Sequence, residues 1–203
     1  MHNSLNTNTK VIKDAINSSF SSFSVRRTLA NLITHSKLNR VLKKTLLLKV
    51  WRNPYNSSND KMNIIFIHIP KCAGTILKHE IKLPDDGHNK AVWYQIADID
   101  KYNRYFKFTV VRNPYDRLVS AYHWLMQGNG HKTTQKWVDL HMNDILSFRN
   151  FVIKLKNDKF RKEVTSWIHF EPQHKWITDN SKKLSLDFIA RYENLERDID
   201  SIS

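Results

Sequence analysis

The chain has 203 residues, and its 33 Lys and Arg against 19 Asp and Glu give a formal net charge of +14. This length suits one domain with a small extension, and an apolar fraction of 40% with 10 Phe, 7 Tyr and 6 Trp can build a hydrophobic core. Cys72 is the single cysteine, which excludes an intrachain disulfide and a cysteine-based zinc site. No apolar run approaches the roughly 20 residues of a membrane span, so we expect a soluble protein of the cytoplasm or another reducing compartment.

The first 60 residues read as a basic extension, because they hold 10 Lys and Arg against 2 Asp and Glu. The Ser- and Asn-rich start, up to residue 24, predicts little regular structure. Residues 25–51 interleave Leu, Ile and Val with basic residues, which predicts a pair of amphipathic helices. These helices would either pack on the main domain or contact an anionic membrane or an acidic polymer. A turn-rich linker over 51–60 then places the main domain at 61–203.

Residues 63–69 are a nearly continuous run of Ile with Phe and His, typical of a strand buried in a parallel sheet. The loop 70–75 follows, and then a predicted helix over 76–81 with Thr75 as its N-cap. Gly74 would let a ligand approach the backbone closely, and Lys71 adds a positive charge. Such a helix start suits a phosphate, although an ordinary strand-to-helix turn fits the residues equally well.

The same loop is not a Walker A loop. That motif places its lysine directly at the helix start and has two glycines, whereas Lys71 precedes Thr75 by four residues and only Gly74 is present. The spacing therefore argues against a P-loop kinase.

Residues 106–111 predict a second strand, with Arg112 at its carboxyl end. Asn113 and Pro114 are a typical N-cap and first residue of a helix, which we expect to end near residues 128–130. In open α/β sheets ligands bind at the carboxyl ends of the strands. Arg112 could therefore bind a second phosphate together with Ser120, two turns into the helix. The alternative is a structural Arg and a serine without function.

Residues 67–75 (Ile-His-Ile-Pro-Lys-Cys-Ala-Gly-Thr) and 111–122 (Val-Arg-Asn-Pro-Tyr-Asp-Arg-Leu-Val-Ser-Ala-Tyr) together resemble two motifs of one family. The family is the carbohydrate sulfotransferases of the heparan and chondroitin type with their bacterial relatives, the family 2 sulfotransferases. Residues 147–155, 171–173 and 186–195 also follow its pattern, so the resemblance covers 62–200. It implies a three-layer α/β, P-loop-like nucleotide-binding fold with a mostly parallel sheet. Family members usually continue further at the C-terminus, so a truncated or inactive homologue stays an alternative.

The resemblance implies transfer of a sulfuryl group from 3′-phosphoadenosine-5′-phosphosulfate (PAPS) to a saccharide hydroxyl, without a metal. The first motif would hold the 5′-phosphosulfate, the second the 3′-phosphate, and a tyrosine further on the adenine. Lys71 would in addition stabilise the leaving phosphate oxygen. The implied nucleotide-binding residues are Lys71, Cys72, Ala73, Gly74, Thr75, Arg112, Ser120 and Tyr192.

The acceptor hydroxyl needs a base. Related enzymes have a histidine between the two motifs in this role, and His88 matches it. His79 also lies in this interval but is less suitably placed, and we expect His68, in the strand, to be structural. Cys72 reads as a small structural residue, with a thiolate of lowered pKa as the alternative. Arg117, next to Asp116, reads as half of a surface ion pair.

Two kinds of partner are expected. A carbohydrate acceptor, as an oligosaccharide, polysaccharide or glycolipid, is expected from the resemblance. The aromatic and basic residues over 123–141 would form its groove or a helical core. Peripheral membrane contact through the basic extension is a further expectation. A nucleic-acid-binding module is the rival on charge alone, but the common motifs are absent, so we expect no nucleic acid.

Overall fold

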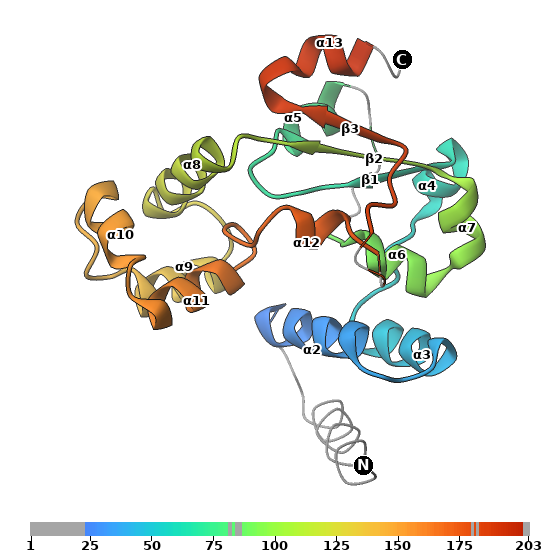
Figure 1. Ribbon diagram of the computed structural model, residues 1–203, viewed down its shortest axis with the longest axis horizontal. Helices are drawn as coiled ribbons and strands as arrows, with labels where there is room; N and C mark the ends of the chain where they lie inside the picture. Colours follow the sequence, from blue (N-terminus) through green and yellow to red (C-terminus); the bar gives the residue numbers. More distant parts are fainter. Residues whose placement is uncertain (1–22, 81–82, 84–86, 180, 182, 201–203) are drawn as a thin grey trace, which may run out of the picture.

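The computed structural model describes residues 23–80, 83, 87–179, 181 and 183–200. Its sheet has three parallel strands in the order β1-β2-β3: β1 (Ile64–Ile67), β2 (Phe106–Val111) and β3 (Phe188–Arg191). In the register, Phe66 pairs with Phe108, and Val111 pairs with Arg191. The predicted α/β class with a parallel sheet is therefore confirmed for the described residues (Figure 1).

Both faces of β1 and β2 are buried. Ile65, Phe66 and Ile67 are at most 2% exposed, as are Phe108 and Val110 on one face of β2, whose other face carries the buried Lys107 and Thr109. Strands buried on both faces are typical of a parallel sheet with helices on both sides. The strand predicted over 63–69 is shorter than expected, because the chain leaves the ladder after Ile67.

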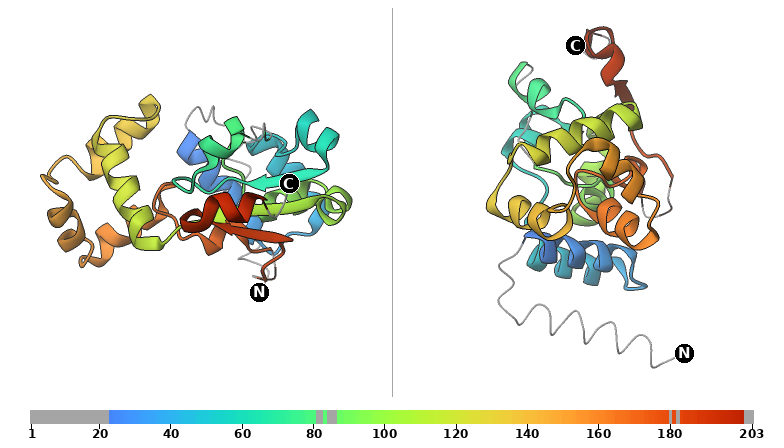
Figure 2. Two further views of the ribbon diagram at one scale, coloured as in Figure 1. Left: turned by 90° about the horizontal axis from the view of Figure 1, so that it is seen from above. Right: turned by 90° about the vertical axis from the view of Figure 1, so that its left-hand side faces the viewer.

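Helices surround this sheet and extend beyond its carboxyl edge. Figures 1 and 2 show α6 and α12 toward one face, α5 and α13 toward the other, and α8 to α11 beyond the carboxyl ends of the strands. The helices are α2 (Phe23–His35), α3 (Arg40–Val50), α4 (Ser57–Met62), α5 (Gly74–Glu80), α6 (Ala91–Ala97), α7 (Ile99–Arg104), α8 (Pro114–Met126), α9 (Lys132–His141), α10 (Phe148–Lys154), α11 (Asp158–Ser166), α12 (His174–Ile177) and α13 (Leu195–Asp200), with the 3-10 turn η1 (Tyr192–Asn194) before α13.

The two helices predicted in the basic extension are confirmed as α2 and α3. They pack against α6 through a buried apolar cluster that includes Ile33, Leu47 and the fully buried Trp93. This packing agrees with a helical pair that lies on the main domain. Membrane contact by the extension stays a prediction, and residues 1–22 lie outside the described residues.

The predicted linker over 51–60 is only partly a linker. Asn56 caps α4 with a capping box, in which its side chain accepts from Ser58 and Asn59, and the helix then runs into β1. Short polar segments of this kind are easily read as turns, because their caps are the same residues that favour turns. The part of the chain that the structure describes contains no helix long and apolar enough to cross a membrane.

Candidate functional site

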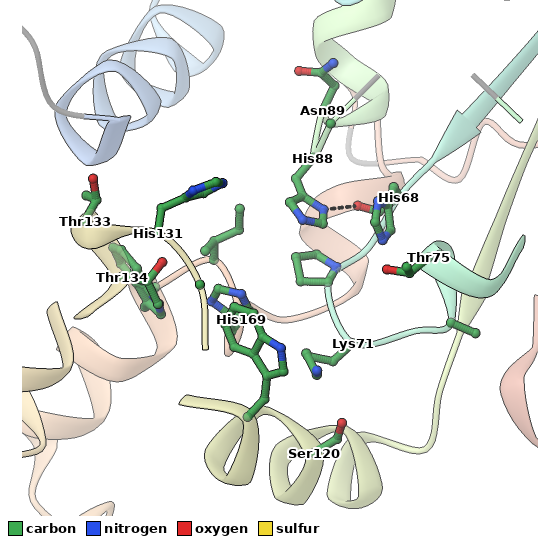
Figure 3. Close-up of a pocket in the computed structure, with 18 of the residues that line it drawn as sticks. His68, Lys71, Thr75, His88, Asn89, Ser120, His131, Thr133, Thr134 and His169 are labelled. Carbon is green, nitrogen blue, oxygen red and sulfur yellow. Dashed lines mark hydrogen bonds between the residues drawn. The ribbon is translucent and has the colours of Figure 1, made fainter. Parts of the chain in front are cut away.

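A cavity of about 920 Å³ opens where the carboxyl ends of β1 and β2 meet the surrounding helices (Figure 3). This volume is typical of pockets for ligands of nucleotide size. Residues from several separate parts of the chain line it. They are Arg26, Val50, Trp51 and Arg52; His68, Pro70, Lys71, Ala73, Gly74, Thr75, Ile76, Gly87, His88 and Asn89; Arg112, Ser120, Trp124, Gly130, His131, Thr133, Thr134, Trp167, Ile168 and His169; and Tyr192.

The loop between β1 and α5 has an unusual backbone. Lys71 and Ala73 have φ values of 68° and 61°, a left-handed conformation that non-glycine residues rarely adopt. Such strain persists only where the surroundings hold it, and it concentrates at binding sites. Because Ala73 bends the chain early, α5 begins at Gly74, and the Leu77 N–H donates to the Ala73 carbonyl at 3.1 Å. The prediction that Thr75 is the N-cap is therefore wrong; Thr75 lies inside the first turn and lines the cavity.

Gly74 is required by packing. A Cβ atom at this position would lie 2.0 Å from Cδ2 of His68, a distance that real structures do not show. His68 is buried, and burial holds the pKa of its imidazole well below the usual value. The expected structural role of His68 fits this position against the start of α5, although its side chain also reaches the cavity.

Arg112 meets Lys71 and Tyr192, as expected for residues at one edge of the sheet. Its guanidinium lies 4.2 Å from the centre of the Tyr192 ring, and Nη1 is 3.5 Å from the Lys71 carbonyl. Gln173 fixes the backbone at this point, because its side chain accepts from the Arg112 N–H at 3.0 Å and donates to the Arg112 carbonyl at 2.7 Å. Ser120, half-buried on α8, faces the same space as the Lys71 side chain in Figure 3.

The Lys71 ammonium lies 4.9 Å from the centre of the Trp124 ring, inside the cavity. Burial lowers its pKa, and the positive charge of Arg112 lowers it further. An anion bound between the two side chains would offset both effects on the Lys71 pKa, because its negative charge stabilises the protonated ammonium. The arrangement is therefore an anion site in its electrostatics.

Cys72 points away from this cavity. It is 1% exposed, and its Sγ lies 3.3 Å from Oε1 of Gln173. Burial raises the pKa of its thiol to about 11. The alternative of a thiolate with a lowered pKa is therefore wrong, and only the backbone of Cys72 is left for a part in ligand binding.

His88 lines the same cavity as Lys71. Its Nδ1 lies 3.1 Å from the His68 carbonyl, and the two rings are 4.2 Å apart between centres. The other candidate, His79, is on the exposed side of α5 with a side chain 89% exposed, and it does not line the cavity. Geometry thus favours His88 over His79. Asp85 and Asp86, next to this loop in the sequence, lie outside the described residues.

Arg117 is a buried residue, so the prediction of a surface ion pair with Asp116 is wrong. It is 5% exposed, its Nε donates to the Pro70 carbonyl at 2.9 Å, and its Nη1 donates to the Glu171 carbonyl at 3.0 Å. The Arg117 side chain therefore connects the loop 70–75, which contains Lys71, to the segment before α12.

Sequence reasoning assigned no role in the site to Arg27 or Lys90. Both pair with the Glu171 carboxylate in a buried cluster behind the cavity. The signal that could have indicated Glu171 is its place in a stretch that follows the family pattern, whereas Arg27 looked like one basic residue among many.

The segment 123–141 is divided between the cavity and the core, and its role as an acceptor groove stays a prediction. Trp124 and His131 line the cavity, with Thr133 and Thr134 beside them. Trp137 instead stacks on Trp167 at 4.8 Å between ring centres and belongs to the core.

The described residues contain no group of three or more His, Cys, Asp or Glu side chains that could hold a metal ion. In comparisons with known proteins, residues 57–203 match the Sulfotransferase family. The match covers more than half of the chain, so the chain belongs to this family, and the protein is a sulfotransferase. Members of this family generally use PAPS as the sulfate donor. Neither curated proteins nor solved structures gave a match.

Proposed function

We propose that this sulfotransferase moves a sulfuryl group from PAPS to a hydroxyl of a saccharide, with its nucleotide site in a P-loop-like strand–loop–helix at β1 and α5. One observation carries the proposal. Lys71, Arg112, Ser120 and Tyr192, which match the donor-binding positions, line one cavity with His88. None of the described residues that line it is an Asp or Glu. A cavity with positive and no negative side chains suits a donor with several negative charges.

The donor would lie along the β1–α5 loop. The N–H groups at the start of α5 and the Lys71 ammonium suit the 5′-phosphosulfate. Arg112 and Ser120 suit the 3′-phosphate, since a guanidinium and a hydroxyl together provide several donors. The Tyr192 ring, whose centre is 4.2 Å from the Arg112 guanidinium, would contact the adenine.

Transfer needs a proton acceptor at the hydroxyl and charge stabilisation at the leaving group. If Nδ1 of His88 donates to the His68 carbonyl, 3.1 Å away, the lone pair of the neutral imidazole is on Nε2. Nε2 then takes the proton as the hydroxyl oxygen bonds to sulfur, and the bond from sulfur to the phosphate oxygen breaks. Lys71 stabilises the negative charge that this oxygen gains. In this scheme His88 accepts the proton and Lys71 stabilises the leaving group.

A transfer assay with labelled PAPS and a panel of oligosaccharides tests the proposal. We expect His88→Ala to lower turnover by about 10²–10⁴-fold, the usual contribution of a positioned base, while the affinity for the product 3′-phosphoadenosine-5′-phosphate (PAP) stays unchanged. Lys71→Ala should lower turnover by about 10²–10³-fold, as the loss of one charge-stabilising donor does elsewhere.

His79→Ala is the matched control, because His79 lies in the same interval of the chain but is exposed and outside the cavity. Full turnover by His88→Ala would show that His88 is not the base. PAP binding without transfer to any acceptor would make the protein a nucleotide-binding homologue that has lost its activity.

A further inference from the structure

Arg27 lies on α2, outside the matched residues 57–203, and yet its guanidinium is buried beside the cavity. The residue is 5% exposed and lies between two aromatic rings, 5.2 Å from the centre of Trp93 and 4.5 Å from that of Trp176. Nη2 donates to Glu171 at 2.9 Å, and Nη1 donates to the backbone carbonyl of His88 at 3.2 Å. One side chain of the extension therefore bonds directly to the candidate base residue.

A second contact holds the same loop two residues later. Lys90 donates to the other Glu171 oxygen at 2.5 Å, and its side chain is 5% exposed. Glu171 thus joins α2 to the loop 87–90 through Arg27 on one oxygen and Lys90 on the other. The loop is fixed at the carbonyl of residue 88 and at the side chain of residue 90.

Stability alone does not account for this cluster. Buried ion pairs contribute little net stability compared with apolar residues of similar size, because their desolvation is costly. What a guanidinium adds is geometry, since its planar fork binds two acceptors in fixed directions and a lysine ammonium does not. Here the two acceptors are the Glu171 carboxylate and the His88 carbonyl.

Two hydrogen bonds restrict the orientation of the His88 ring. Arg27 holds its backbone, and the His68 carbonyl, 3.1 Å from Nδ1, holds one edge of the ring. The opposite edge, with Nε2, is then kept in one orientation. Transfer reactions depend strongly on such orientation, because small displacements of a catalytic group lower the rate.

We propose that Arg27 is a positioning residue for His88, so that the α2–α3 pair is a working part of the catalytic site. The inference rests on the proposed role of His88 as the base. Arg27 acts through the backbone of His88 and through Glu171, and it contacts neither the sulfuryl donor nor the acceptor hydroxyl.

The test compares Arg27→Lys with Ile33→Ala in the full chain. Ile33 is 0% exposed in the apolar cluster that attaches α2 to α6, so its truncation weakens the attachment without removing the bonds to Glu171 and His88. We expect Arg27→Lys to lower kcat about tenfold or more, with KM for PAPS and PAP affinity within about twofold of the original. Ile33→Ala should lower the urea midpoint at least as much but keep kcat within about twofold.

A double-mutant cycle makes the result specific. If Arg27 acts by placing His88, Arg27→Lys should have no further effect on kcat in a His88→Ala background. Equal losses of kcat in Arg27→Lys and Ile33→Ala, or a full additional loss in the double variant, would reduce Arg27 to a structural residue. Full turnover by His88→Ala alone would instead overturn the proposed base, so the two failures are distinguishable.

Discussion

The two walls of the cavity are held together by different interactions. The loop wall, residues 70–75 with Arg112, is fixed by hydrogen bonds to backbone groups, which come from the neutral amide of Gln173 and from Arg117. The helical wall, α2 with the loop 87–90, is fixed by a buried carboxylate, Glu171, between two cations. The side chains that fix the loop wall, Gln173 and Arg117, carry no negative charge, whereas the negative charge of Glu171 in the helical wall is paired with two cations. Both solutions keep the cavity favourable for anions.

Glu171→Gln would break the helical wall and should give the largest loss of stability. It leaves the buried Arg27 and Lys90 without their carboxylate, and removing one partner of a buried pair costs about 3–5 kcal/mol. Urea unfolding measures the loss. Asp144→Asn is the control, because Asp144 is in an exposed pair with Lys154. The stability of this variant should be close to that of the original protein. A Glu171→Gln variant as stable as the control would contradict the importance assigned to this cluster.

Gly74→Ala would break the loop wall. The added Cβ would lie 2.0 Å from the His68 ring, and the loop cannot move freely because Arg117 holds the Pro70 carbonyl. We expect a cost of about 1–3 kcal/mol, as for other overpacked sites, and a loss of PAP affinity of more than about tenfold, because the N–H groups at the start of α5 shift.

The control for this change is Gly128→Ala, at a glycine with φ of 73° whose nearest contact would be 3.8 Å away. The strained backbone costs about 1 kcal/mol there, but PAP affinity should not change, since Gly128 does not line the cavity. Equal PAP affinity in the two variants would show that the loop is not part of the nucleotide site.

The reactivity of Cys72 tests whether the loop wall stays closed in the native protein, and it needs no substitution. Because burial raises the pKa of its thiol to about 11, the thiolate fraction at pH 8 is about 100-fold smaller than for an unperturbed thiol of pKa 9. Alkylation of the native protein at pH 8 should therefore be at least about 100-fold slower than in the urea-unfolded chain. The rate should rise with pH up to about 11. Rapid alkylation of the folded protein would mean that the loop opens.

Features that depend on short stretches of sequence were predicted correctly. Local patterns predict β1, β2 and the cap of α8 at Asn113. The rule that ligand-binding residues gather at the carboxyl ends of parallel strands predicts that Lys71 and Arg112 lie at one edge of the sheet. Arg117 was misassigned because its neighbour Asp116 suggested a surface pair. The better signal was that Arg117 lies on the helix face that buries Ala121 and Leu125.

Local sequence patterns could not predict the ion pairs of the helical wall. Arg27 and Glu171 are 144 residues apart in the chain, and a basic residue in a basic helix carries no sign of burial. Only packing of α2 on α6 brings the guanidinium to the cavity, and packing depends on the whole fold. The prediction for Thr75 failed for a related reason, because no sequence rule predicts the positive φ of Ala73. As a result, α5 begins at Gly74, two residues before the predicted start of the helix at residue 76.

The most direct measurement is a calorimetric titration of the protein, without metal, with PAP and with AMP, which lacks the 3′-phosphate. We expect PAP to bind about 10–100-fold more tightly, as is usual for charge-assisted hydrogen bonds to the 3′-phosphate. Arg112→Ala should lower PAP affinity to that of AMP and leave AMP binding nearly unchanged. Equal affinities of the original protein for PAP and AMP, or a preference for PAP that survives Arg112→Ala, would contradict a 3′-phosphate site at Arg112.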